Sequence, residues 1–308
     1  MTYISHEIPR CLIDEHQDFI SDYQFVLLHK ILEDKDYAEL VCDFANCGEF
    51  TYLDNSCFEL GESLDNKLLY EWFTRLEPNY VVLPDVLGDK KRTLERSLEF
   101  VKDYPDTIIH GMPVIQGASP DEMIECYKEF IHFGPLGSKN LMEGGFPIIG
   151  IPFVYSWADK DPTLQANERI KLLEKMDKEC INKSLKHHLL GTWQAREFAH
   201  YRNYDWIHSI DTSNPVMSAL DGTPYAGIHG LTQKPKSTFD SVYDMKEEDI
   251  NLDLLYYNVD TFREIVTGIG FNAERRSAKF PTSPSPRPRK YPKDLDYYKY
   301  TTYSGTHD

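Results

Sequence analysis

Features that would place the chain in a membrane or outside the cell are missing from its 308 residues. No apolar run approaches the roughly 20 residues that a helix needs to span a bilayer. The start, MTYISHEIPR, lacks the basic, apolar and small-residue regions of a secretory signal peptide. We therefore expect a soluble, cytoplasmic protein without a membrane partner.

Cysteine pairs are also missing. The six cysteines are scattered along the chain, and none belongs to a C-x-x-C pair. Without a secretion signal such cysteines are expected to be reduced thiols. Their spacing matches neither a zinc finger nor a zinc ribbon, so the sequence predicts no metal site of that kind.

Basic residues are few for a protein that meets polyanions. There are 33 Lys and Arg against 50 Asp and Glu, which gives a net charge of -17. A nucleic-acid binder with this balance must gather its basic residues on one face. The alternative is that the acidic residues only keep the protein soluble, and the charge by itself favours that alternative.

Strand-like and helix-like segments alternate along most of the chain. Continuous apolar runs suit strands buried on both faces, and they occur at Phe25 to Leu28, Thr51 to Asp54, Tyr80 to Asp85, Thr107 to Gln116, Phe146 to Phe153, His188 to Thr192 and Trp206 to Asp211. Apolar stripes at helical spacing lie between them, for example Met123, Ile124, Tyr127 and Phe130 after the capping sequence SPDE. Repeated strand-then-helix units predict a parallel sheet.

Glycine motifs of nucleotide-binding open sheets are absent. No G-x-G-x-x-G follows a candidate strand, and there is no G-x-x-x-x-G-K-[ST]. A barrel and an open doubly wound sheet both fit the strand-then-helix pattern, and the missing motifs remove support from nucleotide-binding open sheets. We predict an α/β fold of the (β/α)8 TIM-like barrel type over residues 1–270. Residues 271–308 include the run PTSPSPRPRKYP and many tyrosines, which predicts a Pro-, basic- and Tyr-rich C-terminal tail.

Polar side chains close several candidate strands. They are Asp54, Asp85, Gln116 and Asp211, accompanied by Gly117, Gly150 and Gly191. Reactive groups of α/β barrels lie where strands end, so these side chains are expected to converge. Each aspartate alone is better explained as a helix cap, and Gln116-Gly117 is also compatible with an ordinary turn. The set of four is what favours a site.

Two carboxylates beside an anomeric carbon are the usual apparatus for breaking a glycosidic bond. One attacks C1′ and forms a covalent intermediate, while the other moves protons. A third carboxylate and an amide can read the donor and acceptor edge of a purine. Glycines let the backbone approach a flat base closely.

Five segments of the chain, in order, are LDNSCF at 53–58, VIQG at 114–117, IIGI at 148–151, LLGT at 189–192 and SIDT at 209–212. Together they resemble the motifs of the tRNA-guanine transglycosylase superfamily. In that order the family has D-S-G-G-F, V-Q-G, a base-contacting strand, L-M-G and the strand with the nucleophile. The segment LDNSCFELGES and the strand ending in Pro84-Asp85 are similar to the phage and bacterial branch that inserts 7-deazaguanines into DNA.

The resemblance implies a role for each matching position. Asp211 would be the nucleophile at C1′, and Asp54 the general acid and base for the leaving and incoming bases. The expected base-binding residues are Phe58 (stacking), Asp85 (pyrimidine-side N–H groups), Gln116 with Gly117 and the N–H of Gly150 (carbonyl oxygen), Ile151 (a backbone contact near the 7-substituent) and Gly191 (pocket floor).

Departures from the family bear on the substrate. The tRNA enzymes carry a C-x-C-x-x-C…H zinc site after the nucleophile, whereas the last cysteine here, Cys180, precedes Asp211. Ser56 and Cys57 stand where the family has two glycines, and they are expected to crowd the pocket. The missing zinc subdomain favours DNA, with a tRNA-guanine transglycosylase lacking zinc as the alternative.

The expected partners follow from this interpretation. They are DNA at guanine sites and a free 7-deazaguanine base such as 7-cyano-7-deazaguanine, with either a second copy of the chain or a helper protein. No cofactor and no metal is expected. The base would have to be flipped out of a duplex or presented on a single strand.

Basic residues near the predicted mouth are candidates for phosphate contacts. Lys90, Lys91 and Arg92 follow Asp85, although a solvated first helical turn explains them equally well. Lys183 and Lys186 are less well placed, because they precede a candidate strand. Further candidates are Lys234, Lys236, Arg275, Arg276, Arg287, Arg289 and Lys290.

Histidines offer a rival interpretation as a metal-dependent barrel hydrolase. The set would be His110, His187, His188 and His208 with the aspartates. Because His187 and His188 open their candidate strand, both are expected at the opposite end from the site.

Overall fold

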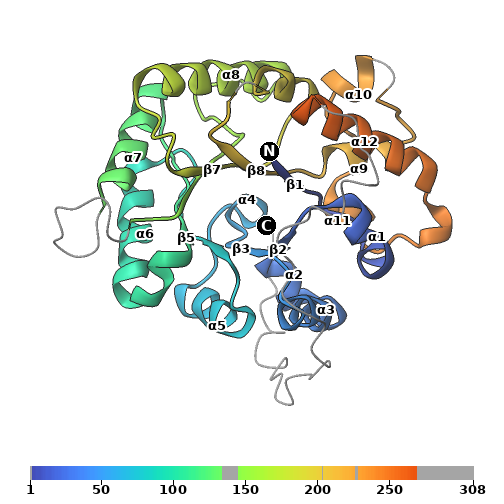
Figure 1. Cartoon of the computed structure of the whole chain (residues 1–308), viewed down its shortest axis with the longest axis horizontal. Coiled ribbons are helices and arrows are strands. Elements are labelled where there is room, and N and C mark those ends of the chain that lie inside the picture. The colour runs from blue at the N-terminus through green and yellow to red at the C-terminus, as the bar shows by residue number, and fades with distance from the viewer. Residues whose placement is uncertain (1, 134–144, 203, 226–227, 269–308) are drawn as a thin grey trace.

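Parallel strands alternate with helices, so the fold class is α/β as predicted. The computed structural model describes residues 2–133, 145–202, 204–225 and 228–268. The predicted tail, 271–308, lies outside these residues. Figure 1 shows the strands near the centre of the molecule and the longer helices around them. The strands are β1 (Tyr3–Ser5), β2 (Gln24–Leu27), β3 (Thr51–Asp54), β4 (Tyr80–Val82), β5 (Gly111–Met112), β6 (Ile148–Ile151), β7 (Lys186–Leu189) and β8 (Ile207–Asp211).

Helices follow most strands and cover them from outside. The α-helices are α1 (Ile13–Ile20), α2 (Leu28–Glu33), α3 (Lys35–Asn46), α4 (Cys57–Leu60), α5 (Asn66–Leu76), α6 (Lys90–Asp103), α7 (Pro120–His132), α8 (Pro162–Glu179), α9 (Asn214–Leu220), α10 (Ile228–Thr232), α11 (Phe239–Val242) and α12 (Leu252–Thr267). Short 3-10 helices are η1 (Arg10–Leu12), η2 (Pro105–His110), η3 (Ala195–His200) and η4 (Glu247–Asp249). None of the helices within the described ranges combines the length and apolar character that crossing a bilayer requires.

The capping sequence before α7 works as predicted. The Ser119 side chain accepts the N–H of Glu122, and Pro120 occupies the first turn. The predicted stripe is buried, with Met123, Tyr127 and Phe130 facing the core. Local sequence therefore determines where this helix begins and which face it buries.

The strands form two four-stranded parallel sheets, in the orders β1-β8-β7-β6 and β2-β3-β4-β5. The predicted barrel is not present as one continuous ladder. Between β5 and β6 the pairing is reduced to a single bridge, Val114 with Gly150. Pro113 follows β5 directly, and because proline has no N–H it cannot continue the ladder as a donor.

At the other junction, between β1 and β2, hydrogen bonds to side chains take the place of a regular backbone ladder. The N–H of Ile4 donates to the Asp22 carboxylate at 2.9 Å, and the N–H of His6 donates to Ser21 Oγ at 2.8 Å. One backbone bond, from Asp22 N–H to the Ile4 carbonyl at 2.7 Å, also crosses this junction. The sheets are thus linked at both sides, but not by regular ladders.

The sequence prediction missed the first strand. It began the series at Phe25 to Leu28, which is β2, whereas β1 at Tyr3–Ser5 precedes it and pairs with β8. Three residues are too few for a clear apolar run. The consequence matters for the site, because Ser5 lies directly beside Asp211 in this pairing.

Aromatic and aliphatic side chains fill the space between the sheets. Tyr52 of β3 packs against Tyr23 and Tyr80, with ring centroids 4.6 and 4.9 Å apart. Its hydroxyl lies 2.9 Å from Ser209 Oγ on β8 in the other sheet. Side chains therefore hold the two sheets together through the interior as well as at the edges.

Candidate active site

Two of the predicted carboxylates, Asp54 and Asp211, lie in different sheets and line one cavity. Asp54 ends β3 and Asp211 ends β8. The cavity has a volume of about 320 Å³ and is also lined by Phe25, Phe153 and Lys234. Both aspartates are buried, with exposed fractions of 8% and 5%. The ends of β3 and β8 thus bring to one cavity the two carboxylates that the sequence predicts for breaking a glycosidic bond.

Asp85 belongs to a second polar group. Its Oδ1 accepts a hydrogen bond from the Asn55 amide at 3.0 Å, and its Oδ2 accepts one from the Gln116 amide at 2.8 Å. Gln116 Oε1 accepts the N–H of Gly88 at 3.0 Å. Burial raises the pKa of the Asp85 carboxyl, and the hydrogen bonds from Asn55 and Gln116 oppose that rise. The two side chains predicted to read a base therefore lie side by side.

A smaller cavity of about 60 Å³ contains Asp85 and Gln116 and adjoins the first. The residues that line both cavities are Asp54, Phe58, Phe153 and Leu190. The Phe58 ring is 48% exposed, and its centroid lies 5.0 Å from that of Phe153. These two rings therefore stand at the boundary between the carboxylate pair and the Asp85–Gln116 pair.

His188 contacts Asp211, and here the sequence prediction was wrong. It placed His187 and His188 at the opposite end of their strand from the site. His187 does face away and bonds the Tyr127 hydroxyl at 2.9 Å. His188 Nε2 lies 2.9 Å from Asp211 Oδ1. The strand begins earlier than expected, at Lys186, so His188 is its third residue and pairs with Ser209, two residues before Asp211.

Gly191 also contacts Asp211 and lines the same cavity. Its N–H donates to Asp211 Oδ1 at 3.2 Å. Its φ of 55° is left-handed, and an added Cβ would lie 2.5 Å from the Phe153 ring. Only glycine fits this close approach without strain.

A buried ion pair between Arg169 and Glu197 contacts the loop that contains Gly191. Arg169 of α8 donates to the carbonyls of Leu190 and Gly191 at 2.9 and 2.8 Å, and pairs with Glu197 at 2.8 Å. The Arg169 and Glu197 side chains are 0% and 1% exposed. Sequence reasoning did not name Arg169, because its partners come from segments that follow the next strand.

Replacing Arg169 with methionine is expected to destabilise the protein by about 3–5 kcal/mol, because Glu197 is left buried and unpaired and two carbonyls lose their donor. Urea unfolding monitored by circular dichroism measures the change. Lys171→Met on the same helix is the control. That lysine is exposed and pairs with Glu168, so its loss should cost no more than about 0.5 kcal/mol.

A second substitution separates burial of charge from loss of packing. Adding Glu197→Leu to Arg169→Met removes the unpaired carboxylate, and should recover part of the lost stability. A double variant as unstable as the sum of the single variants would contradict the assignment of the cost to unpaired charge.

The residues in place of the family's two glycines do not block Asp54. Ser56 adopts a left-handed φ of 59°, which costs roughly 1–2 kcal/mol for a non-glycine residue. Its Oγ accepts the N–H of His29 at 3.0 Å, and its own N–H donates to Asp54 Oδ2 at 2.7 Å. Cys57 Sγ contacts the Asp85 carbonyl. The predicted crowding falls on the smaller cavity, which Cys57 lines.

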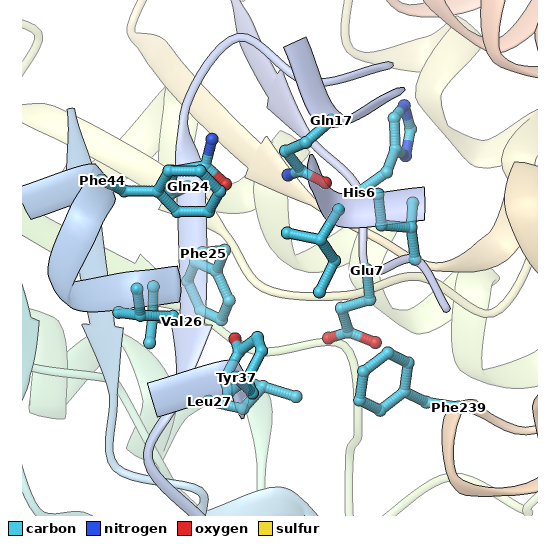
Figure 2. Close-up of a pocket in the computed structure, with 13 residues that line it drawn as sticks. His6, Glu7, Gln17, Gln24, Phe25, Val26, Leu27, Tyr37, Phe44 and Phe239 are labelled. Carbon is cyan, nitrogen blue, oxygen red and sulfur yellow. The ribbon is translucent and has the colours of Figure 1, made fainter. Parts of the chain in front are cut away.

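Glu7 and Glu59 are further carboxylates of the larger cavity, and the sequence prediction named neither. Figure 2 shows Glu7 beside the ring of Phe239, in a small neighbouring cavity that it also lines. Glu7 follows β1, so recognition of that strand would have identified it. Burial raises the pKa of Asp54 and of Glu7 well above the ordinary range, and neighbouring carboxylates add to the rise.

Two of the predicted backbone contacts are already satisfied within the fold. The N–H of Gly150, expected to meet a base, donates to the Pro113 carbonyl at 2.9 Å. The carbonyl of Ile151 accepts the N–H of Leu190 at 3.0 Å. Gly117 has a packing role, because a Cβ there would lie 2.7 Å from Glu122 in α7. Gly150 and Ile151 thus serve β6 and its neighbours, and Gly150 is corrected as a donor to the base.

The basic residues that follow Asp85 begin α6, close to the site. Lys90 pairs with Glu125 of α7, and Lys91 lies 3.8 Å from Glu95. Lys234 lines the larger cavity itself, with its Nζ 4.5 Å from the centroid of the Trp193 ring. Lys234 is therefore a basic residue that faces the cavity of the carboxylates. Arg275, Arg276, Arg287, Arg289 and Lys290 lie outside the described residues.

The four histidines of the rival metal interpretation are not gathered at one place in the described part of the chain. His110 bonds the Asn79 carbonyl, whereas His188 bonds Asp211. Within the described ranges, potential metal ligands gather only at Glu15, His16 and Glu247, away from the cavity of Asp54 and Asp211.

No family model matches the chain, and a search of curated proteins also finds no match.

Proposed function

We propose that this chain is a DNA-guanine transglycosylase, which exchanges guanine in DNA for a 7-deazaguanine base by covalent double displacement at C1′. One observation carries the proposal. The buried pair Asp54 and Asp211 lines a cavity that adjoins a second cavity containing the linked pair Asp85 and Gln116. The first pair suits glycosidic chemistry, and the second suits recognition of a purine edge.

The two sheets are, in this proposal, halves of a (β/α)8 TIM-like barrel. Support comes from the pairing of the first strand with the last, and from the Val114–Gly150 bridge on the other side. Asp54 and Asp211 end their strands, whereas Asp85 and Gln116 follow theirs. This is the end of a barrel at which catalytic residues gather.

The reaction is a balanced exchange of one base for another. An Asp211 carboxylate oxygen forms a bond to C1′ while the C1′–N9 bond breaks. The electron pair of the C1′–N9 bond leaves with guanine. Asp54 gives that base a proton. The incoming 7-deazaguanine then loses its N9 proton to Asp54 and displaces Asp211 from C1′. No net oxidation or reduction occurs.

The raised pKa of Asp54 supports its role as the acid. Its pKa is raised well above the ordinary range, first by burial and then by the charge of Glu59. A carboxyl group held neutral by its surroundings can donate a proton to a departing base at neutral pH. Asp211 instead accepts two hydrogen bonds, from His188 and Gly191, which hold its carboxylate in place for attack.

The smaller cavity must open to admit a base. Phe58, half exposed at the boundary, contacts Phe153, so movement of this ring would join the two cavities. A flat base inserted there would lie against an aromatic ring and reach Asp85 and Gln116. The target base must leave the helical stack, which costs a few kcal/mol unless the DNA is single-stranded.

Base incorporation tests the proposal directly. The purified chain, incubated with radiolabelled guanine and single- or double-stranded DNA, is expected to place label in the DNA. Excess unlabelled 7-cyano-7-deazaguanine should then chase the label out. The same incubation with unmodified tRNA is the matched comparison. Label in tRNA alone would identify a zinc-free tRNA-guanine transglycosylase, and no label in either polymer would refute transglycosylation.

A further inference from the structure

A buried chain of hydrogen bonds leads from one sheet to Asp211 in the other. The Tyr52 hydroxyl lies 2.9 Å from Ser209 Oγ, which lies 2.9 Å from His188 Nδ1. His188 Nε2 lies 2.9 Å from Asp211 Oδ1. Tyr52, His188 and Ser209 are fully buried, so water does not compete for these bonds. This series of hydrogen bonds therefore holds the His188 ring against Asp211.

Donors and acceptors along this chain can be assigned. An ionised carboxylate only accepts hydrogen bonds, so His188 Nε2 carries a hydrogen. In a neutral ring Nδ1 then accepts from the Ser209 hydroxyl, whose oxygen accepts from Tyr52. Burial raises the pKa of Tyr52, which keeps its hydroxyl protonated as a donor. Every bond then has one donor and one acceptor, and His188 has a single tautomer.

The Phe25 ring limits the orientation of His188. The two rings are stacked, with centroids 5.5 Å apart and an interplanar angle of 13°. Asp211 Oδ1 receives the His188 bond and the Gly191 N–H. Within the described residues both hydrogen bonds to this carboxylate thus go to the same oxygen. Its Oδ2 is left for a substrate.

We propose that His188 is a positioning residue that holds Asp211 through Oδ1 and presents Oδ2 as the oxygen that attacks C1′. This inference rests on the proposed transglycosylase function. His188 keeps its proton throughout: Oδ2 forms the bond to C1′, the base leaves with the C1′–N9 electron pair, and Asp54 supplies the proton.

The neighbouring carboxylates explain why Asp211 needs a residue that holds it in position. Asp54, Glu7 and Glu59 line the same cavity, and each disfavours a further negative charge. The hydrogen bond from His188 holds the Asp211 carboxylate in one orientation in that setting. Without it the carboxylate is free to rotate away from C1′.

Two substitutions of similar size separate this role from simple packing. The amide nitrogen of glutamine can reach the place of His188 Nε2, whereas an asparagine amide reaches only the place of Nδ1. His188→Asn is therefore expected to lower kcat for base exchange about 10- to 100-fold, with KM for guanine nearly unchanged. His188→Gln should stay within about threefold of the original kcat.

Ser209→Ala provides an independent variant if His188→Asn does not fold. It leaves the Asp211 contact but removes the partner of Nδ1, so a smaller fall in kcat, about 3- to 10-fold, is expected. Thermal unfolding of each variant checks that the fold is retained. Equal activity of His188→Asn and the original chain, or equal losses in His188→Asn and His188→Gln, would overturn the proposal.

A spectroscopic measurement distinguishes failure of this inference from failure of the proposed function. Nitrogen-15 NMR of the histidine rings, assigned by the signal lost in His188→Asn, should report a hydrogen on Nε2 and none on Nδ1 of His188. This readout requires no activity. An Nδ1–H tautomer would refute the inference, whereas a correct tautomer in a chain that exchanges no base would refute the transglycosylase proposal alone.

Discussion

Asp211→Asn is expected to abolish base exchange, lowering its rate by about 10³-fold or more, while DNA binding is retained. The amide cannot form the covalent bond to C1′, yet it has nearly the same shape as the carboxylate. Gly191 N–H can still donate to its oxygen, so the pocket should remain formed. Incorporation of labelled guanine measures the rate, and a gel-shift titration measures DNA binding.

A trapped covalent adduct makes this test more specific. In the original chain, denaturation during turnover should leave DNA attached to protein, and mass spectrometry of the peptides should locate the attachment at Asp211. Asp240→Asn is a suitable control, because Asp240 lines the same cavity but pairs with Lys30 at 2.6 Å. An adduct that persists in Asp211→Asn would assign the nucleophile to another residue.

Asp54→Asn is expected to lower base exchange by about 10²-fold or more and, at the same time, to stabilise the fold at alkaline pH. The loss of activity follows from removal of the general acid. The gain in stability follows from the raised pKa of Asp54, which burial and the charges of Glu59 and Asp211 produce. Asparagine is neutral and can still accept the N–H of Ser56.

The sign of the pH dependence follows from proton binding. Because the folded-state pKa of Asp54 lies above its unfolded value, the folded chain binds more protons. Its contribution to stability is therefore present below the unfolded pKa and is lost as pH rises through the folded pKa. Asp54→Asn lacks this dependence. Its advantage should grow from about pH 4 upwards and reach about 1 kcal/mol or more at pH 8.

Urea unfolding of both proteins at pH 5, 6.5 and 8 measures this difference in the free energy of unfolding. The same raised pKa predicts that guanine release by the original chain slows as pH rises, because the protonated acid is lost. If Asp54→Asn were equally favourable at pH 5 and pH 8, Asp54 would be ionised throughout and could not act as the acid.

The strand ends illustrate how much of the site could be predicted from sequence. A buried parallel strand has a continuous apolar run, and the first polar residue after it marks the carboxyl end. This reasoning selected Asp54, Asp85, Gln116 and Asp211, and the structure brings them to two adjoining cavities. It failed for Glu7, because β1 is only three residues long and has no such run.

Contacts between strands could not be predicted from the apolar runs of single strands. His188 was placed at the wrong end because its strand begins at Lys186, and the register between β7 and β8 shifts at His187 and His188. Gly150 was taken as a donor to a base, although its N–H bonds Pro113. Register depends on pairing partners, and a sequence pattern along one strand does not contain them.

The sequence by itself determined the α/β class and the capped helix α7, and it identified the aspartates that end or follow strands, since each of these depends on residues close together in the chain. Only the tertiary structure decided that the strands divide into two sheets, that Arg169 holds the Gly191 loop and that His188 meets Asp211. Those contacts join residues from separate elements. Their geometry is set by strand register and helix packing, which follow from the whole fold and not from any one segment.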